Sequence, residues 1–251
     1  MIANERYFKI LDTLNQKQSI TINEMTKLLN TSESTIRRDL TVLHNQKKLI
    51  KVHGGAICNP NLYISGEQTL TDKKLMYQNE KMDIAKKATD FILPNDFVYI
   101  DAGTTTYEMV HFIKEKSATY MTNSINIATY LTENDFNVFI VGGQIKLTTQ
   151  AIIGCFAKDY IQNFNFNVGF FGTNGISIQN GYTTPDVEEA SIKKIAMSKC
   201  GRCFVLSDKS KFDLVSSVTF GHLKNATIIT NKFKDNTNLN LIKQHTEILE
   251  V

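Results

Sequence analysis

Residues that could bind a small anionic ligand occur in a short polar segment at positions 101–106. This segment follows an apolar run and leads into an expected helix. Free N–H groups at a helix start and the helix dipole favour a phosphate, and glycine lets the backbone approach it closely. A simple N-cap turn explains this hexapeptide equally well. The candidate ligand-binding residues here are Asp101, Gly103, Thr104, Thr105 and Thr106.

Four further polar segments follow apolar runs in the same way. They contain Asn123 and Ser124, then Gly142 and Gly143, then residues 172–176 with 181–184, and finally residues 207–211. The last segment supplies cations, including Lys211, near the place where an anion would lie. One such segment is weak support, but five in sequence predict a small-molecule pocket.

The apolar runs before these segments have the length of buried strands. They lie at residues 97–100, 118–121, 138–141, 168–171 and 204–206, with another at 227–229, and helical segments separate most of them. Continuous apolar strands alternating with helices predict an α/β domain with a mainly parallel sheet covered by helices. In such sheets ligands bind beyond the carboxyl ends of the strands.

A second kind of chemistry is expected from a helix over about residues 32–48. Ile36, Leu40 and Leu43 form one apolar stripe at helical spacing. A two-arginine face lies opposite, and arginine can pair with guanine while hydroxyls reach bases or phosphates. A solvated surface helix is the alternative. The candidate DNA-contacting residues on this helix are Ser34, Thr35, Arg37, Arg38 and Thr41.

Elements on both sides of this helix favour DNA binding. Helices are expected at residues 4–15 and from Thr21, where Thr21 and Glu24 have capping-box spacing. After the third helix, residues 49–57 alternate apolar with basic and turn at two glycines, which predicts a hairpin whose Lys51 and His53 lie along phosphates. Three helices followed by such a hairpin form a winged helix-turn-helix.

The charge distribution agrees with this division. The first 57 residues hold nine of the 28 basic and five of the 25 acidic residues, so their net charge is +4 and that of the remainder is −1. The chain is 42% hydrophobic and has no apolar run near 18 residues, so we expect no membrane span and no signal peptide. Its four cysteines do not have the spacing of a zinc site. We therefore expect reduced thiols in a cytoplasmic protein, and no metal or cofactor.

Two separated motifs resemble the N-terminal part of the DeoR family of bacterial transcriptional regulators. Arg6 and Ile10 precede a stretch that reads SESTIRRDL from Ser32, and VHGGA follows from Val52. Thr31, where an apolar residue is usual, and Lys48, where a small residue is common, depart from the family pattern. In the second half DAGTTT, TNS, VGG, GTNGI, GYTTPDVEEA and LSDKSKF occur in the family's order, so the resemblance covers nearly the whole chain.

The resemblance implies a sensor domain similar in fold to ribose-5-phosphate isomerase and to CoA-transferase-like proteins, with a phosphorylated sugar as effector. Residues 103–106 would hold the phosphate, with help from Lys211. Asp101, Asn123, Thr173, Asn174 and Thr184 would face the sugar hydroxyls; Ser124 and Gly143 complete the expected site. The expected domains are 1–57 for DNA binding, 58–78 as a linker and 79–251 for sensing.

An enzyme is the alternative from another class. Sugar-phosphate isomerisation needs a carboxylate base beside the sugar carbons. The isomerases carry acidic residues in the loop that matches residues 172–176, and this chain has no acidic residue there. The acidic residues at 186–189 stand at the start of an expected helix, where the helix dipole favours acidic side chains without any catalytic role. Asp101 and Asp208 remain as possible bases. We therefore expect a regulator without catalytic residues, most simply a homo-oligomeric repressor of a sugar-use operon released by its effector; an activator or an effector-strengthened repressor is the alternative.

Overall fold

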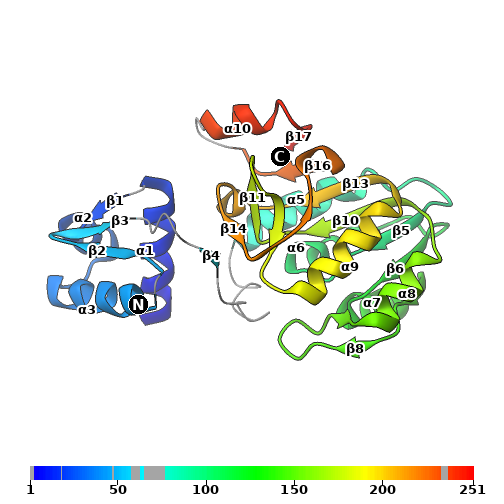
Figure 1. The fold of residues 1–251 in the computed structure, drawn as a ribbon, viewed down its shortest axis with the longest axis horizontal. Coiled ribbons are helices and arrows are strands. Elements are labelled where there is room, and N and C mark those ends of the chain that lie inside the picture. Colours follow the sequence, from blue (N-terminus) through cyan, green and yellow to red (C-terminus); the bar gives the residue numbers. More distant parts are fainter. Residues whose placement is uncertain (1–2, 18, 47, 58–62, 65–76, 233–236) are drawn as a thin grey trace. The chain divides into compact units, whose positions relative to one another are not determined.

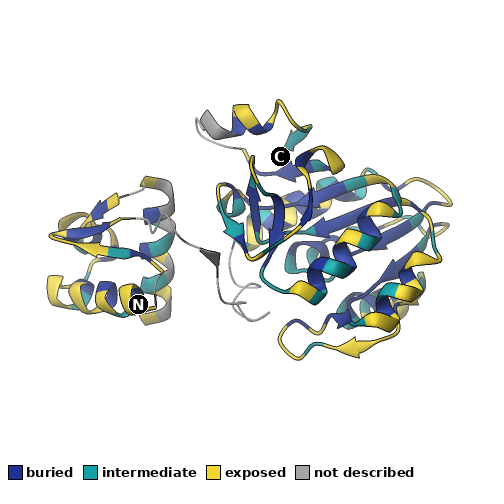
Figure 2. Ribbon diagram, in the orientation of Figure 1, coloured by how far each residue is buried: buried dark blue, intermediate teal, exposed yellow. Residues whose placement is uncertain are grey.

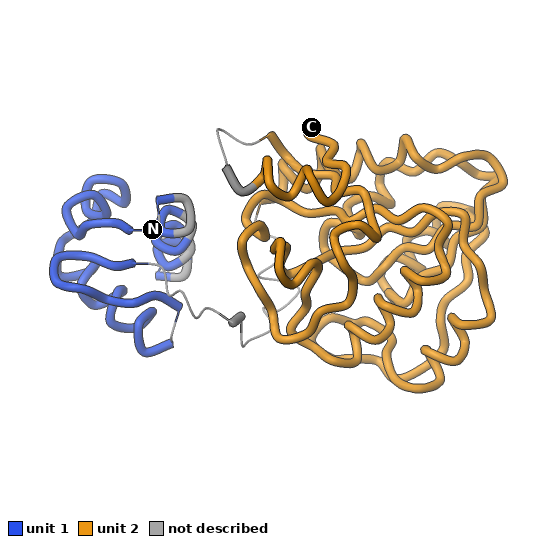
Figure 3. The backbone as a smooth tube through the Cα atoms, turned by 45° about the horizontal axis from the view of Figure 1, so that its top comes forward, with its two compact units in different colours: residues 1–63 blue, residues 64–251 orange. Residues whose placement is uncertain are grey.

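The computed structural model describes residues 3–17, 19–46, 48–57, 63–64, 77–232 and 237–251. The chain divides into two compact units, residues 1–63 and 64–251 (Figure 3). Most of the expected linker, residues 58–62 and 65–76, lies outside the described residues, so the predicted domain limits stay a prediction.

The described residues of the first unit form three helices and one small antiparallel sheet (Figure 1). Its strands pair in the order β1-β3-β2, so that β3 lies between the other two. This is the predicted helix-turn-helix with its wing. The elements are α1 (Ala3–Lys17), β1 (Ser19–Thr21), α2 (Ile22–Leu29), α3 (Glu33–Asn45), β2 (Ile50–Val52) and β3 (Gly55–Ile57).

Side-chain caps set the helix starts of this unit. The Thr21 hydroxyl accepts from the Glu24 N–H at 3.2 Å, and the Glu24 carboxylate accepts from the Thr21 N–H at 2.9 Å, which confirms the predicted capping box. The Ser32 hydroxyl caps α3 by accepting from the N–H of Thr35. Asn30 ends α2 in the left-handed region at φ 45°, which asparagine tolerates.

One local prediction for this unit was wrong. Helix α3 ends at Asn45 rather than near Lys48, and the chain after it buries Leu49 in the core of the unit. Between the first two helices, Ser19 begins β1, because this strand pairs with β3, a partner distant in sequence. The predicted stripe of Ile36, Leu40 and Leu43 is fully buried.

The second unit is built on a seven-stranded sheet in which every neighbouring pair is parallel. The strand order is β17-β16-β13-β10-β5-β6-β7. All the predicted strands overlap observed ones. The strands are β5 (Phe97–Ile100), β6 (Thr119–Thr122), β7 (Asn137–Ile140), β10 (Phe166–Gly172), β13 (Cys200–Leu206), β16 (Thr227–Thr230) and β17 (Ile248–Glu250).

Helices cover both faces of this sheet, as Figure 2 shows by the buried inner sides of the ribbons. One hydrophobic cluster joins one face to α5 (Gln78–Thr89), α6 (Thr104–Met109) and α7 (Ile125–Glu133). A second cluster joins the other face to α8 (Cys155–Gln162), α9 (Val187–Ser198) and α10 (Thr237–Ile242). Tyr99 belongs to one cluster and its neighbours Val98 and Ile100 to the other, as the side-chain alternation of a strand requires.

Short strands and turns complete the unit on the α9 side. They include a small antiparallel sheet in the order β11-β12-β15 and a hairpin of β8 and β9. None of the helices in the described parts is long and apolar enough to cross a membrane. These elements are β11 (Gly175–Ser177), β12 (Gly181–Thr184), β15 (Val218–Gly221), β8 (Gln144–Ile145), β9 (Ile152–Ile153), the 3₁₀ turns Lys209–Lys211 and Leu223–Asn225, and β14 (Val215–Ser216), which pairs with β4 (Tyr63–Ile64).

The strand order places a switch point between β5 and β10. From there β6 and β7 continue to one side, and β13, β16 and β17 continue to the other. The loops after β5 and β10 therefore leave the sheet side by side in opposite directions, which opens a crevice at the carboxyl ends of these strands.

Candidate functional site

A pocket occupies this crevice. Its empty space is about 690 Å³, including the solvent at its mouth. The loops after β5, β10 and β13, the inner side of α9 and the start of α5 form its walls. The lining residues are Tyr77, Lys81, Ala102, Gly103, Thr104, Thr105, Thr149, Gly172, Thr173, Asn174, Glu189, Lys193, Leu206, Ser207, Asp208 and Lys211.

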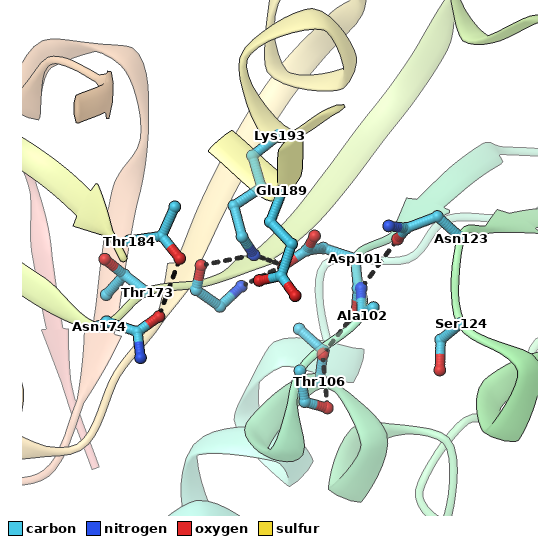
Figure 4. A network of polar contacts seen from close by, with 12 residues as sticks. Asp101, Ala102, Thr106, Asn123, Ser124, Thr173, Asn174, Thr184, Glu189 and Lys193 are labelled. Atoms are coloured by element: carbon cyan, nitrogen blue, oxygen red, sulfur yellow. Dashed lines mark hydrogen bonds and ion pairs between the residues drawn. The ribbon is translucent and has the colours of Figure 1, made fainter. Parts of the chain in front are cut away.

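A buried ion pair forms the floor of the pocket. Lys193 on α9 donates to the Asp101 carboxylate and, at 3.1 Å, to the carbonyl of Gly172, and the Gly172 N–H donates to Asp101 at 3.0 Å (Figure 4). Burial raises the pKa of Asp101, and the ammonium of Lys193 opposes that rise. The pair ties β5, β10 and α9 together at the point where the strands diverge.

A second charged group faces the pocket from α9. The Glu189 carboxylate accepts from the Thr149 hydroxyl at 2.7 Å and from Lys146 at 3.2 Å, and Lys146 also pairs with Asp186 at 3.0 Å. These contacts fasten the β8–β9 connection to the start of α9. The negative charge of Glu189 is thus balanced, and its oxygens stay at the pocket wall.

Lys211 differs from Lys193 and Glu189, two pocket residues that form ion pairs, in its lack of an oppositely charged partner among the described residues. Lys193 is balanced by Asp101 and Glu189 by Lys146, whereas Lys211 has no acidic partner among the residues that the structure describes. The Asp208 carboxylate accepts instead from the backbone N–H of Ser210 at 2.9 Å and from its hydroxyl. Lys211 therefore leaves a positive charge at the pocket that no described carboxylate balances.

The first unit presents a separate polar surface on α3. Ser34, Arg37, Arg38 and Thr41 are exposed on the side opposite the buried stripe, as predicted. Arg37 pairs with Glu33 one helical turn earlier, with Nε to carboxylate at 3.0 Å. Thr35, next to this surface, is half-buried.

The wing lies against the same helix. Lys51 on β2 donates to the Thr41 hydroxyl at 2.7 Å, so the two predicted DNA contacts adjoin. His53 is exposed at the turn between β2 and β3, beside Gly54 with its φ of +81°. The exposed face of α3 and the wing thus form one basic surface, which we call the reading surface.

An ion pair inside the unit holds α3 behind the reading surface. Arg6 on α1 donates to both carboxylate oxygens of Asp39, at 2.7 and 3.1 Å, and Asp39 is buried. A two-pronged arginine–carboxylate pair fixes direction as well as distance. The pair therefore sets the rotation of α3 about its own axis.

Comparisons with known proteins connect these two surfaces to one family. A profile described as the DeoR C terminal sensor domain matches residues 76–232, and one described as the DeoR-like helix-turn-helix domain matches residues 6–61. The chain belongs to the DeoR family. It is a DNA-binding transcriptional regulator.

Relatives of this DeoR-family chain carry regulator names. The uncharacterized HTH-type transcriptional regulator FruR of Bacillus subtilis (strain 168) is 35% identical over 94% of both chains. The lactose phosphotransferase system repressor of Staphylococcus aureus (strain NCTC 8325) is 28% identical over the full length of both. A putative aga operon transcriptional repressor of Escherichia coli O157:H7 is 31% identical over 84% of this chain and 79% of its own.

Likenesses to solved structures are weaker. Ribose-5-phosphate isomerase A from Methanocaldococcus jannaschii is 11% identical, with 54% of each chain covered and a TM-score of 0.41. A probable sor operon regulator from Shigella flexneri is 9% identical, with 57% of this chain and 87% of its own covered and a TM-score of 0.38.

The pocket of this DeoR-family regulator includes part of the predicted effector site. The predicted residues that line the pocket are Gly103, Thr104, Thr105, Thr173, Asn174 and Lys211. The positions of these six residues agree with the prediction, and their binding roles stay predictions.

Six other predicted residues do not line the pocket. Asp101 lies beneath the wall, paired with Lys193. The amide oxygen of Asn123 accepts from the Ala102 N–H at 2.9 Å and from the Tyr99 hydroxyl at 3.2 Å, so it supports the loop after β5 (Figure 4). The hydroxyl of Thr106 donates to the Asp101 carbonyl, and the hydroxyl of Thr184 donates to the side chain of Asn174. Ser124 caps α7, and Gly143 lines a groove beside α8.

Other pocket residues were missed from the sequence. The acidic residues at the start of α9 were attributed to the helix dipole. Asp186 does cap the helix, but Glu189 and Lys193 face the pocket. Their four-residue spacing on the buried side of a helix was the available signal. The missed residues are Tyr77, Lys81, Thr149, Glu189 and Lys193, whereas Ser207 and Asp208 lie in the predicted segment 207–211.

The cysteines form no recognisable site in the described part of the chain. Cys155, Cys200 and Cys203 are free thiols, and Cys200 and Cys203 donate to carbonyl groups of α9. No group of three or more metal-ligating side chains is found among the described residues.

Proposed function

We propose that this regulator represses genes for the uptake or use of a sugar, and that a phosphorylated form of that sugar releases it from its operator. The names of the lactose phosphotransferase and aga operon repressors support the sugar theme. The observation that carries the effector class is the pocket with Lys211, whose positive charge has no acidic partner among the described residues, opposite hydroxyl and amide groups.

A phosphate fits one end of this pocket. Lys211, Gly103 and Thr104 line the pocket from different elements and are the groups that we assign to the phosphate, together with Lys193, which also holds Asp101. The sugar then extends toward Asn174 and Glu189, whose oxygens and amide can bind hydroxyl groups. The phosphate-binding role follows the family resemblance, with Lys193 added to the predicted set.

Release from DNA requires the effector to favour one arrangement of the chain over another. Tyr77 and Lys81 line the pocket and stand at the start of the described stretch 77–232 of the second unit, which begins at Ile64. A bound ligand would therefore touch residues near the beginning of the sensor unit. We propose that this contact changes how the DNA-binding units are presented.

On DNA, α3 enters the major groove through Ser34, Thr35, Arg37, Arg38 and Thr41, while Lys51 and His53 lie along the phosphates. The protein acts in the cytoplasm as a homo-oligomer, so that two reading surfaces meet two half-sites. An activator or an effector-strengthened repressor would use the same surfaces. Catalysis is not proposed, because Asp101, a predicted candidate base, is occupied by Lys193 and Gly172.

Thermal unfolding of the whole protein with a panel of sugar phosphates and their parent sugars tests the effector class. A phosphate ester at one hundred times its dissociation constant stabilises the folded state by about 2.7 kcal/mol, which raises Tm by roughly 5–10 °C for a unit of this size. The parent sugar should have no such effect, and the active ester should lower affinity for operator DNA.

Lys211→Ala supplies the residue-level test, and Lys209→Ala, on the same 3₁₀ turn but exposed and outside the pocket, is the matched control. Lys211→Ala should lose most of the Tm shift while keeping DNA binding without ligand. An equal shift in both variants, or a parent sugar as effective as its phosphate, would contradict the phosphate site.

A further inference from the structure

An exposed apolar face lies on the sensor unit away from the effector pocket. A groove between the end of β7 and helix α8 is lined by Ile140, Gly142, Gly143, Phe156, Asp159, Tyr160 and Asn163. Phe156 is 77% exposed, and Ile140 and Tyr160 are about 40% exposed. We call Ile140, Phe156 and Tyr160, which all line the groove, the β7–α8 face.

The amount of apolar surface on this face is large for so few residues. With about 150–250 Å² per aromatic side chain, Phe156 and Tyr160 leave roughly 230 Å² in water, and Ile140 adds to this area. Contiguous apolar patches of a few hundred Å² are the largest that monomers usually expose, and they are often functional. A standard interface buries about 800 Å² on each partner, so the β7–α8 face supplies about a third of that area in apolar side chains alone.

The edge of the sheet lies at the same place. β7 is the last strand of the seven, and no strand in the described residues pairs with its outer side. An open strand edge offers unpaired N–H and C=O groups to another strand. Two copies related by a two-fold axis could bring their β7 strands together and continue one sheet into the next.

The shape and charge of the face favour a second copy over other partners. Phe156 is largely exposed in the wall of the groove, and a two-fold axis beside it would bring each copy's phenyl ring against the other's groove, as a self-complementary interface requires. Asp159 is the one charged residue that lines the groove, which gives nucleic acid no cations to contact. Depletion of charge and enrichment in aromatic residues mark the centre of protein interfaces.

We propose that the β7–α8 face is the surface through which two copies of this chain associate. The inference depends on the proposed assembly into a homo-oligomer and adds the surface that mediates it. It also gives Gly143, predicted in the effector site, a different position: its backbone lies in the wall of the interface groove.

Sedimentation of the full chain over a range of concentrations tests the proposal. The wild type should show a species of at least twice the chain mass of 28.4 kDa. Phe156→Asp places a carboxylate in the contact and should weaken association by at least about 30-fold, the effect of losing a central aromatic contact. Ile140→Asp, on the opposite side of the groove, should act in the same direction.

Ile178→Asp is the matched control, because Ile178 is an equally apolar residue, 40% exposed, in the β11–β12 connection outside this face. It should leave the assembly intact. Circular dichroism should be the same for all variants, since Phe156 contributes little to the core.

The outcomes separate the two proposals. A monomeric wild type would overturn the assembly itself and leave the face to another occupant, such as the first unit of the chain. A wild-type oligomer that survives both Phe156→Asp and Ile140→Asp would keep the assembly and overturn the β7–α8 face as its surface. Dissociation by both variants with intact assembly in Ile178→Asp supports the proposal.

Discussion

Replacing Lys193 by methionine should destabilise the sensor unit strongly and in a pH-dependent way. The side chains of Lys193 and Asp101 are 4% and 1% exposed, so water screens their pairing very little. Removal of one partner from a buried pair costs about 3–5 kcal/mol, because the other charge stays buried without compensation. Methionine retains most of the volume of the lysine side chain, so loss of packing contributes little.

Protonation of Asp101 limits this loss. Neutralising a carboxyl with an ordinary pKa near 3.9 costs about 4 kcal/mol at pH 7 and about 1.5 kcal/mol at pH 5. Burial already raises the pKa of Asp101, and loss of the ammonium raises it further. A carboxyl whose pKa is raised on folding destabilises the folded state above that pKa, and the effect is relieved as the pH falls. Lys193→Met should therefore cost about 3–4 kcal/mol at pH 7 and about half of that or less at pH 5.

Urea unfolding without effector, followed by tyrosine fluorescence because the chain has no tryptophan, measures both values. With a slope near 2 kcal/mol/M, the midpoint for the sensor unit should fall by about 1.5–2 M at pH 7. Lys194→Met, exposed on the same helix, should change little. Combining Asp101→Asn with Lys193→Met should recover stability relative to Lys193→Met alone, because no charge is left buried. A loss below 1 kcal/mol at pH 7, or an equal loss at both pH values, would refute the reasoning.

Three predictions concern the DNA-binding unit. Arg38→Ala should weaken operator binding by about 1–3 kcal/mol if Arg38 contacts a base, and should weaken binding to every DNA sequence equally if Arg38 contacts phosphate. Titrations with operator DNA and with unrelated DNA distinguish the two kinds of contact, and Lys27→Ala, at an exposed position, is the control. Gly55→Ala should abolish DNA binding, because its Cβ would overlap a carbonyl of β1, whereas Gly54→Asn, at a left-handed position with open space, should retain it in the same assay. Hydrogen bonds at the N-cap lower the pKa of Glu24, so the stability that its carboxylate contributes disappears as the pH falls. Glu24→Gln should therefore reduce the fall in the free energy of unfolding below about pH 5, measured by urea titration. An unchanged pH dependence in the variant would contradict this explanation.

Local patterns were sufficient where neighbours in sequence decide the structure. Thr21 and Glu24 predicted a helix start because both capping partners lie within one turn, and Ile36, Leu40 and Leu43 predicted a buried stripe because helix geometry alone places them together. The apolar runs likewise located the strands of the parallel sheet, because a strand covered on both faces must be apolar throughout.

Contacts between side chains far apart in the sequence could not be predicted from such local patterns. Arg6 belonged to the motif that resembles the family, but its pairing with Asp39, 33 residues away, appears only when α1 packs across α3. Asn123 looked like a ligand group because it follows a strand, yet its amide supports the loop of a neighbouring strand. Glu189 was attributed to the helix dipole and Lys193 was not singled out, because their sequence context does not reveal which side of α9 faces the crevice.

The sequence by itself determined the order of elements, the reading surface and the family, because capping, periodicity and contiguous motifs depend on residues close together in the chain. Tertiary structure decided the composition of the pocket, because strand order, which brings β5 next to β10, is set by packing between distant segments. That order made Asp101 the partner of Lys193 and placed Lys211 at the pocket.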